Sequence, residues 1–286
     1  MPAVTEAPAR PLLPLAVLPS LLVSLAAFCL FALQIRPVGY ALLVVGVGLS
    51  WLLARKDLVE TGKPGEGPHL TRDLSLVALG LVCASSIHLE AKLDTVAMIA
   101  FTLALGGAVV VPYVLSRFVF RDHAIRFPWR GGTRWSVWQW TWLGAVLVLG
   151  WLILPFYFVS SEVYLNWPVV DDANLMVRLF LGVGAVGIWD ELFFICTCFA
   201  LLRRHMSDIT ANALQTIIFV SFLWELGYRA WGPVLTIPFA LLQAVIFLKT
   251  KSLGYVVTVH LLFDAVVFLV LVHGHNPGLL DAIFLI

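Results

Sequence analysis

The sequence predicts an all-α, polytopic membrane helix bundle with about nine transmembrane helices and a cytoplasmic N-terminus. Hydrophobic residues make up 61% of the 286 positions and charged residues only 12%, which is not the balance of a soluble domain. Runs of about 18 or more mostly apolar residues recur along the chain, and each is long enough to cross a bilayer as a helix. The lysines and arginines concentrate in alternate connections, which orients the bundle.

The apolar runs divide the chain into nine expected spans. The second, third and eighth runs are short, so a span could be re-entrant. The first run is too long for a signal peptide and lacks a convincing cleavage site, so we interpret it as a retained span. The expected spans are 11–33, 39–54, 74–89, 95–116, 138–159, 175–202, 209–227, 235–248 and 253–272.

The distribution of basic residues predicts the topology. With the N-terminus inside, 14 of the 18 lysines and arginines fall on the cytoplasmic side, and the C-terminus lies outside. This bias follows the positive-inside rule. We therefore expect an integral, multi-pass protein in the lipid bilayer, most simply of a bacterial plasma (inner) membrane. The basic residues left on the outer side are Arg36, Lys92, Arg178 and Arg229.

The segment 117–137 combines five arginines with several aromatic residues. Basic and aromatic side chains together at the inner face are typical of a segment that rests among lipid headgroups, so we expect this segment to be interfacial. No linker is long enough to divide the chain. We therefore expect one membrane domain, 1–286, whose N-terminal spans occupy residues 1–160.

Charge and cysteine content exclude two classes of function. The net charge is only +1, and no basic patch is interleaved with aromatic residues, so a nucleic acid is not an expected partner. All four cysteines lie in apolar stretches, and no disulfide framework is implied. They are Cys29, Cys83, Cys196 and Cys198.

Two adjacent acids, Asp190 and Glu191, interrupt the long apolar stretch 175–202. A charged Asp at the centre of a membrane helix costs roughly 2.5 to 3.5 kcal/mol, and a second carboxylate adds to this. Two ionised neighbours also repel, so at least one is expected to be protonated, paired or metal-bound. No basic residue follows within two turns. A partner inside the membrane must therefore come from another helix.

Three further ionisable residues lie in later apolar stretches. His260 and Asp264 are spaced i and i+4, so both can face one cavity. Glu225 lies nearer the outer end of its span, where it could instead reach water or pair with Arg229. Five ionisable groups in three helices most simply form one polar site inside the bundle.

These residues resemble the motifs of the CAAX prenyl protease and bacteriocin-processing family, the glutamic intramembrane proteases. That family carries EExxxR on one membrane helix, FxxxH on the next and HxxxN or HxxxD on a later one. The resemblance covers about residues 175–272, which would form the core of the domain. The corresponding stretches are Asp190-Glu191-xxx-Ile195, Ser221-xxx-Glu225 and His260-xxx-Asp264, of which only the third matches cleanly.

The resemblance implies an intramembrane endopeptidase that cleaves a membrane-embedded or lipidated protein or peptide without a required cofactor. Asp190 takes the position of the family's catalytic Glu, and Glu191 that of its second Glu. Glu225 stands where a His would help to activate water. His260 and Asp264 would stabilise the oxyanion.

The departures from the motifs leave other functions open. Ile195 removes the arginine of the first motif, and Glu225 replaces a histidine with an acid. The resulting set is rich in oxygen and lacks positive charge, which a bound divalent cation would correct. Such a metal would be held by Glu191, Glu225, His260 and Asp264. The alternatives to an acid-pair peptidase are therefore a metal-dependent peptidase and a non-proteolytic protein of the same fold that binds a metal ion or a partner. An ion-coupled transporter is a weaker alternative, because no repeat is apparent.

Overall fold

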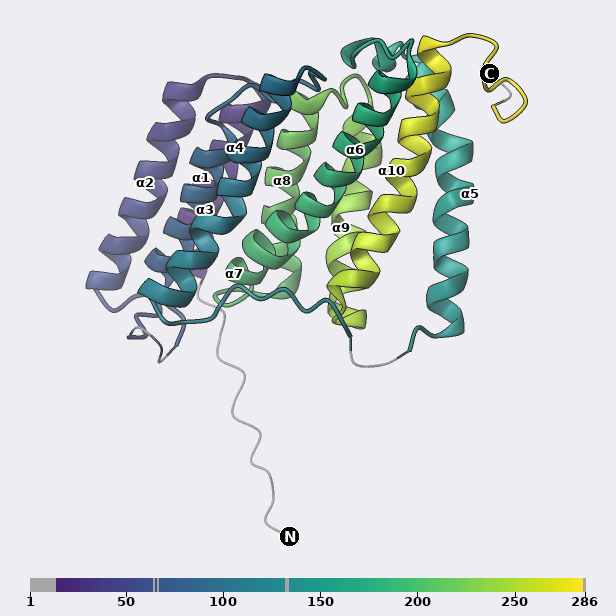
Figure 1. Ribbon diagram of the computed structural model, residues 1–286. Helices are drawn as coiled ribbons and strands as arrows, with labels where there is room; N and C mark the ends of the chain where they lie inside the picture. Colours follow the sequence, from purple (N-terminus) through teal and green to yellow (C-terminus); the bar gives the residue numbers. More distant parts are fainter. Residues whose placement is uncertain (1–13, 64, 66, 132–133, 285–286) are drawn as a thin grey trace.

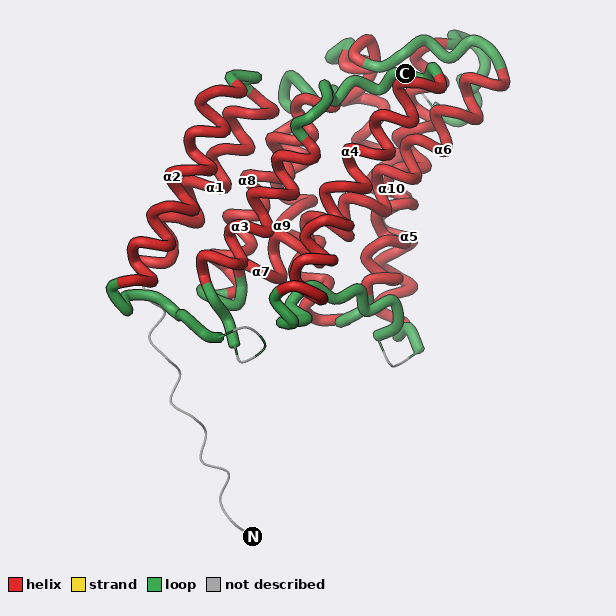
Figure 2. The backbone as a smooth tube through the Cα atoms, turned by 60° about the vertical axis from the view of Figure 1, so that its left-hand side comes forward, coloured by secondary structure: helices red, strands yellow, loops and turns green. Residues whose placement is uncertain are grey.

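The computed structural model describes residues 14–63, 65, 67–131 and 134–284. Within these residues the chain has no β-strands and forms nine helical rods that run side by side in one bundle (Figures 1 and 2). The rods are α1 with the π-turn η2 (Val17–Ala27, Phe28–Ala32), α2 (Arg36–Arg55), α3 (Leu70–Ala84), α4 with the π-turn η3 (Thr95–Val114, Leu115–Val119), α5 (Val137–Ser160), α6 with the π-helix η5 and α7 (Ala173–Asp190, Glu191–Phe199, Ala200–Leu202), α8 (Asp208–Leu226), α9 (Gly232–Thr250) and α10 (Leu253–His275).

Seven of these rods are long and apolar enough to cross a membrane, and the chain is an integral, multi-pass membrane protein. The two shorter rods are Val17–Ala32 and α3. The expected spans 39–54 and 235–248 were too short, since α2 and α9 have 20 and 19 residues. Each begins with a proline in its first turn, where the missing N–H is not needed, so hydropathy alone places the start too late. Arg10 and residues 11–13 of the first expected span lie outside the described residues.

Hydroxyl and carboxylate side chains define where most of the long helices begin. Each accepts a hydrogen bond from a backbone N–H in the first turn, which satisfies a donor that the helix itself leaves unpaired. The capping residues are Asp94 for α4, Ser136 for α5, Asp172 for α6, Ser207 for α8 and Ser252 for α10.

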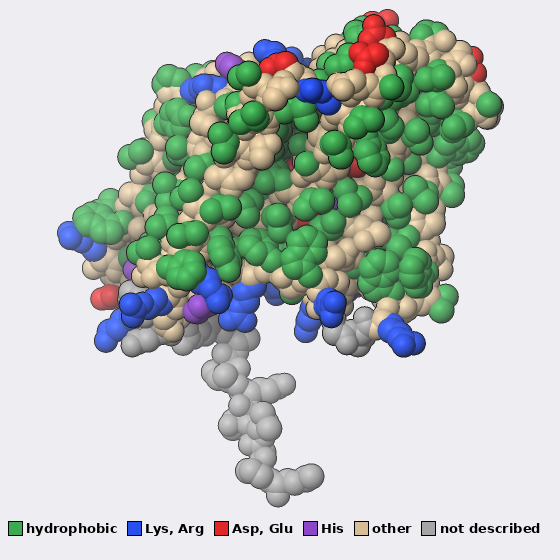
Figure 3. All heavy atoms as spheres, viewed as in Figure 1, with side chains coloured by type: hydrophobic (Ala, Val, Ile, Leu, Met, Phe, Trp, Pro, Cys, Tyr) green, Lys and Arg blue, Asp and Glu red, His purple; other side chains and the backbone are tan. Residues whose placement is uncertain are grey.

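Lys and Arg side chains are concentrated at one end of the bundle, and acids gather at the other end beside a few Lys and Arg. The blue Lys and Arg side chains gather along the lower face in Figure 3, and acids gather on the upper face above α6. The lower face comprises the connections α2–α3, α4–α5, α7–α8 and α9–α10 (Figure 1). We call these the basic face and the acidic face. The alternation matches the predicted grouping of the connections, and the cytoplasmic location of the basic face stays a prediction.

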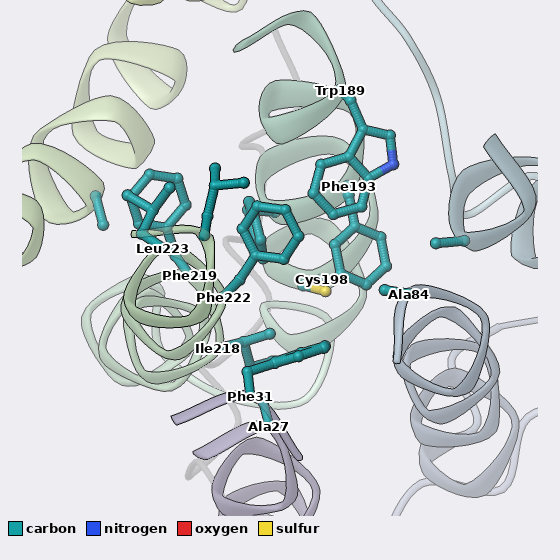
Figure 4. Packing of buried hydrophobic residues seen from close by; sticks show 14 of the residues in the cluster. Ala27, Phe31, Ala84, Trp189, Phe193, Cys198, Ile218, Phe219, Phe222 and Leu223 are labelled. Atoms are coloured by element: carbon teal, nitrogen blue, oxygen red, sulfur yellow. The ribbon is translucent and has the colours of Figure 1, made fainter. Parts of the chain in front are cut away.

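The rod formed by α6, η5 and α7 lies at the centre of the bundle. It is the most buried of the candidate spans, because 72% of the residues in its most apolar stretch are buried, compared with 28% in α2. Its aromatic residues pack against those of α8, and Phe222 of α8 in turn packs against Phe31 of η2 (Figure 4). Phe194 contacts Phe219 and Phe222 edge-on at centroid distances of 4.9 and 5.6 Å. Such packing fixes the rotation of the rod, and therefore the direction in which its acids point.

The predicted interfacial segment runs along the basic face from α4 to α5 (Figure 1). It is also anchored to the start of α10, because Leu253 N–H donates to Pro128 O at 2.8 Å and Gly254 N–H donates to Trp129 O at 3.1 Å. These bonds satisfy two of the unpaired donors at the N-terminus of α10. The segment thus helps to position the helix that carries His260 and Asp264.

Candidate active site

His260 is the centre of a buried polar cluster. Its Nδ1–H donates to Glu191 Oε1 at 2.7 Å, and the amide of Gln243 on α9 donates to the same oxygen at 2.7 Å. Gln243 is itself held by Val256 O at 3.2 Å. The Phe239 ring packs edge-on against the imidazole at 4.9 Å. Glu191 therefore sets the orientation of the imidazole, and the other ring nitrogen is directed away from this contact.

Two further carboxylates lie near the second nitrogen of the ring. His260 Nε2 is 3.5 Å from Asp190 Oδ2 and 3.9 Å from Asp264 Oδ1. These separations exceed a good direct hydrogen bond, so both carboxylates face the second ring nitrogen without being bonded to it. The other oxygens of both acids, Asp190 Oδ1 and Asp264 Oδ2, are buried without a hydrogen-bond partner among the described residues. The cluster therefore offers acceptors that its own side chains do not use.

The two adjacent acids have different surroundings because the helix carries them in different directions. Asp190 ends α6 and Glu191 begins the π-helix η5, which extends to Phe199. Wide helical turns of this kind are frequent at functional sites, where they redirect a side chain. Asp190 faces the cavity described below, whereas Glu191 points to His260 and Gln243.

A glycine on α6 lets the carboxylate of α10 approach. A Cβ added to Gly187 would collide with Asp264 Oδ2 and would lie 3.4 Å from His260 Cδ2. Only a residue without a side chain leaves this space, so Gly187 determines how closely Asp264 packs against the helix that carries Asp190.

The cluster lies at the inner end of a cavity of about 430 Å³. Its walls are mostly apolar and come from α4, α6, α9, α10 and the end of α8. Asp190, His260 and Asp264 line it, together with the phenol of Tyr228 from the loop after α8. A largely apolar cavity with a few convergent polar groups is the usual form of a ligand site.

Glu225 does not join this cluster. Its Oε1 accepts from the Leu89 backbone N–H and from the Gln34 amide, both at 3.3 Å, and lies 3.6 Å from His88 Nδ1. The expectation that all five groups share one site is therefore wrong for Glu225. The reason is the rotation of α8, which directs Glu225 to the loops beside α1 and α3, while Leu223 and Leu226 face the cavity.

This placement also separates the four residues of the expected metal set. Glu191, His260 and Asp264 lie together, and Glu225 binds elsewhere. Among the described residues, no three His, Cys, Asp or Glu side chains are arranged to hold a metal ion. The donor set that motivated the metal hypothesis is thus not assembled.

Comparison with known families supports the assignment of the segment that holds the cluster. Residues 172–266 match the family model described as type II CAAX prenyl endopeptidase Rce1-like. This match spans 95 of the 286 residues. It includes all four residues of the cluster on α6, η5 and α10, and confirms the family that the motifs indicated. No curated protein and no solved structure matches the chain.

Two polar residues at the cluster and its cavity were not predicted from the sequence. Gln243 is a buried amide in the middle of an apolar helix, which is itself a signal of a polar partner in the membrane. Tyr228 lies past the end of α8, where it looks like an ordinary loop residue. Its ring is buried edge-on against Trp167 at 5.8 Å, and the residue lines the cavity beside the cluster. Burial and the nearby carboxyl of Asp264 raise the pKa of Tyr228 well above its usual value, so the hydroxyl keeps its proton at neutral pH.

Proposed function

We propose that this chain hydrolyses a peptide bond in a membrane-associated polypeptide. The observation that carries the proposal is the 2.7 Å contact between His260 and Glu191 beside Asp190, at the inner end of a membrane-buried cavity. An oriented imidazole next to a second carboxylate is an arrangement that can activate water and stabilise developing charge. The Rce1-like match over these same residues supports the same class of reaction.

His260 and Asp190 both line the cavity, with Nε2 and Oδ2 3.5 Å apart, so a water molecule that enters the cavity beside them is within reach of the carboxylate. The water oxygen attacks the carbonyl carbon of the peptide bond, and Asp190 accepts a proton from the water at the same time. The carbonyl oxygen becomes an oxyanion, to which His260 Nε2–H donates. When the carbon–nitrogen bond breaks, Asp190 returns the proton to the leaving amine. The products are a carboxyl group and an amine, and all protons are accounted for.

Glu191 and Asp264 have supporting roles in this proposal. Glu191 holds Nδ1–H and balances the charge of an imidazole that carries both protons. Asp264 flanks the oxyanion from the other side. Three carboxyl groups this close to one another cannot all be ionised in a buried site, so one carboxyl keeps a proton and can donate it in a hydrogen bond.

Cleavage in reconstituted vesicles tests the function. The substrates are membrane-anchored fluorogenic peptides, with and without an isoprenoid thioether, so that a requirement for prenylation is measured directly. The wild type is expected to cleave, and Glu191→Ala and His260→Ala to lose activity while retaining the wild-type Tm. Glu225→Gln is the matched control, since it changes a buried acid outside the cluster. Undiminished cleavage by both cluster variants would refute the proposal.

A further inference from the structure

The cavity reaches the surface at the acidic face. Its lining on α4 lies between Met98 and Gly106, in the half of the helix that begins at Thr95 near that face. On α9 the lining residues are Leu235, Thr236 and Phe239, close to the start of the helix at Gly232 on the same side. Residues 90–93 of the α3–α4 loop form the rim. Each helix that lines the cavity therefore does so with its part between the cluster and the acidic face.

Toward the basic face the cluster is closed by packed side chains. Tyr255 and Val256, one turn before His260 on α10, are fully buried, and so are Cys198 and Phe199 on η5. Gln243 occupies the space between α9 and these residues through its bonds to Glu191 and Val256. A ligand cannot reach Asp190 from the basic face without displacing this core.

The cavity also opens sideways between α4 and α6. Gly106 on α4 and Gly182 on α6 both line it, and a Cβ added to either would meet no atom within 4 Å. Leu181 lines the cavity and is nevertheless 58% exposed. The slot ends below at Trp189, whose Nε1–H donates to Leu105 O at 2.7 Å and ties the two helices together. We call this opening the α4–α6 slot.

Charge indicates which side of the membrane this opening faces. Exposed basic residues such as Lys56, Arg121 and Lys251 lie in the connections of the basic face, and exposed acids such as Glu162 and Asp171 lie at the acidic face (Figure 3). Connections rich in Lys and Arg stay in the cytoplasm. The cavity and the α4–α6 slot then face the non-cytoplasmic half of the bilayer.

We propose that substrate enters from the non-cytoplasmic half of the membrane, as an apolar segment of a membrane-anchored polypeptide that passes through the α4–α6 slot. That the occupant is a substrate rests on the proposed peptidase function, whereas the direction of access does not. An apolar occupant suits the slot, because its walls carry few polar groups and a polar chain would lose its hydration there. Glu90 and Lys92, the ionic groups that the described residues place at the rim, pair with each other at 2.7 Å.

Thiol labelling in intact cells tests the side of access without any need for cleavage. The background carries Cys29→Ser and Cys83→Ser, and retains the buried Cys196 and Cys198 as unreactive. Ala91→Cys places a thiol at the rim, and Lys56→Cys places the matched control on the basic face. A membrane-impermeant maleimide is expected to label Ala91→Cys in intact cells, and Lys56→Cys only after permeabilisation. The reverse pattern would overturn the proposal.

Obstruction of the slot tests the route. Gly182→Trp fills the slot, and Gly144→Trp on α5 is the control, because that glycine also meets no atom within 4 Å. We expect Gly182→Trp to cut cleavage of a membrane-anchored peptide at least about tenfold, with Gly144→Trp unchanged. Gly106→Phe repeats the test from the opposite wall if Gly182→Trp fails to fold. Full activity of a folded slot variant would refute the route. A wild type that cleaves nothing would refute the peptidase function, and labelling would still decide the side of access.

Discussion

His260 Nδ1 lies 2.7 Å from Glu191 Oε1, although the two residues are 69 positions apart in the chain. The contact joins α10 to the π-helix that follows α6, and the Gln243 amide from α9 completes it. Three helices therefore meet at one carboxylate oxygen inside the membrane. The low polarity of the surroundings strengthens each of these hydrogen bonds. Removing one partner is costly because it leaves the other partner buried and unpaired.

The Gln243 amide is expected to position the carboxylate that orients His260. Gln243→Leu keeps a similar volume but removes the donor to Glu191 Oε1. A hydrogen bond to a charged group contributes about 1.5 to 3 kcal/mol, so kcat should fall about tenfold or more while KM stays near the wild-type value. Steady-state cleavage in vesicles measures kcat and KM separately. Gln243→Glu would repel Glu191 and should be worse, and equal activity of the two variants would contradict the role.

Gly187→Ala is expected to impair activity through Asp264. The added methyl group would collide with Asp264 Oδ2, and overpacking of this kind costs about 1 to 3 kcal/mol. Gly184→Ala, on the same helix as Gly187, is the control, because its Cβ would lie at an ordinary contact distance of 3.8 Å from Leu261 of α10. Cleavage rates and Tm of the two variants provide the comparison. The assignment of Asp264 to the site is contradicted if Gly187→Ala cleaves as fast as Gly184→Ala.

The Tyr228 hydroxyl is expected to donate to the reacting carbonyl oxygen. Tyr228→Phe keeps the ring packed against Trp167 and removes only the donor. Loss of one oxyanion donor lowers kcat by about 10²–10³-fold, with little change in KM. Tyr255→Phe removes a hydroxyl that donates to Gln139 O near the basic face, and should leave kcat unchanged. If both variants behave alike, the Tyr228 hydroxyl has no part in the reaction.

Glu225 is expected to matter for stability rather than for the chemical step. Glu225→Ala leaves the buried Leu89 N–H without its acceptor, which should lower the free energy of unfolding by about 1 to 3 kcal/mol. Leu89 precedes residues 90–93 at the rim of the cavity, so KM can rise while kcat holds. Thermal unfolding in detergent and steady-state kinetics separate the two effects. Loss of kcat at unchanged Tm would return Glu225 to the catalytic group.

Chelation is expected to leave cleavage unchanged. The donors proposed for a metal do not come together, since Glu225 binds Leu89 and Gln34 rather than facing His260. Treatment with EDTA followed by elemental analysis of the purified protein provides the measurement. A stoichiometric transition metal, together with activity that EDTA abolishes and the metal restores, would contradict this prediction.

The helices and the candidate reactive residues can be predicted from local patterns in the sequence. Apolar runs predicted nine helices, because burying a helix in lipid depends on the composition of each run by itself. The i, i+4 spacing of His260 and Asp264 put both on one face of α10 before any contact was known. Adjacent positions on a helix point about 100° apart, so Asp190 and Glu191 cannot both aim in one direction. The connections rich in Lys and Arg fall on one side of the bundle because successive helices cross it in opposite directions.

Only the tertiary structure decided how each helix is rotated about its axis. That rotation depends on packing between residues far apart in sequence, such as Phe194 against Phe219 and Phe222. It assigned Asp190 to the cavity and Glu191 to His260, and it turned Glu225 toward the loops beside α1 and α3. It also brought in Gln243 and Tyr228. Apolar runs cannot specify such rotation, because lipid accepts any apolar face equally and only side-chain interlocking distinguishes one face from another.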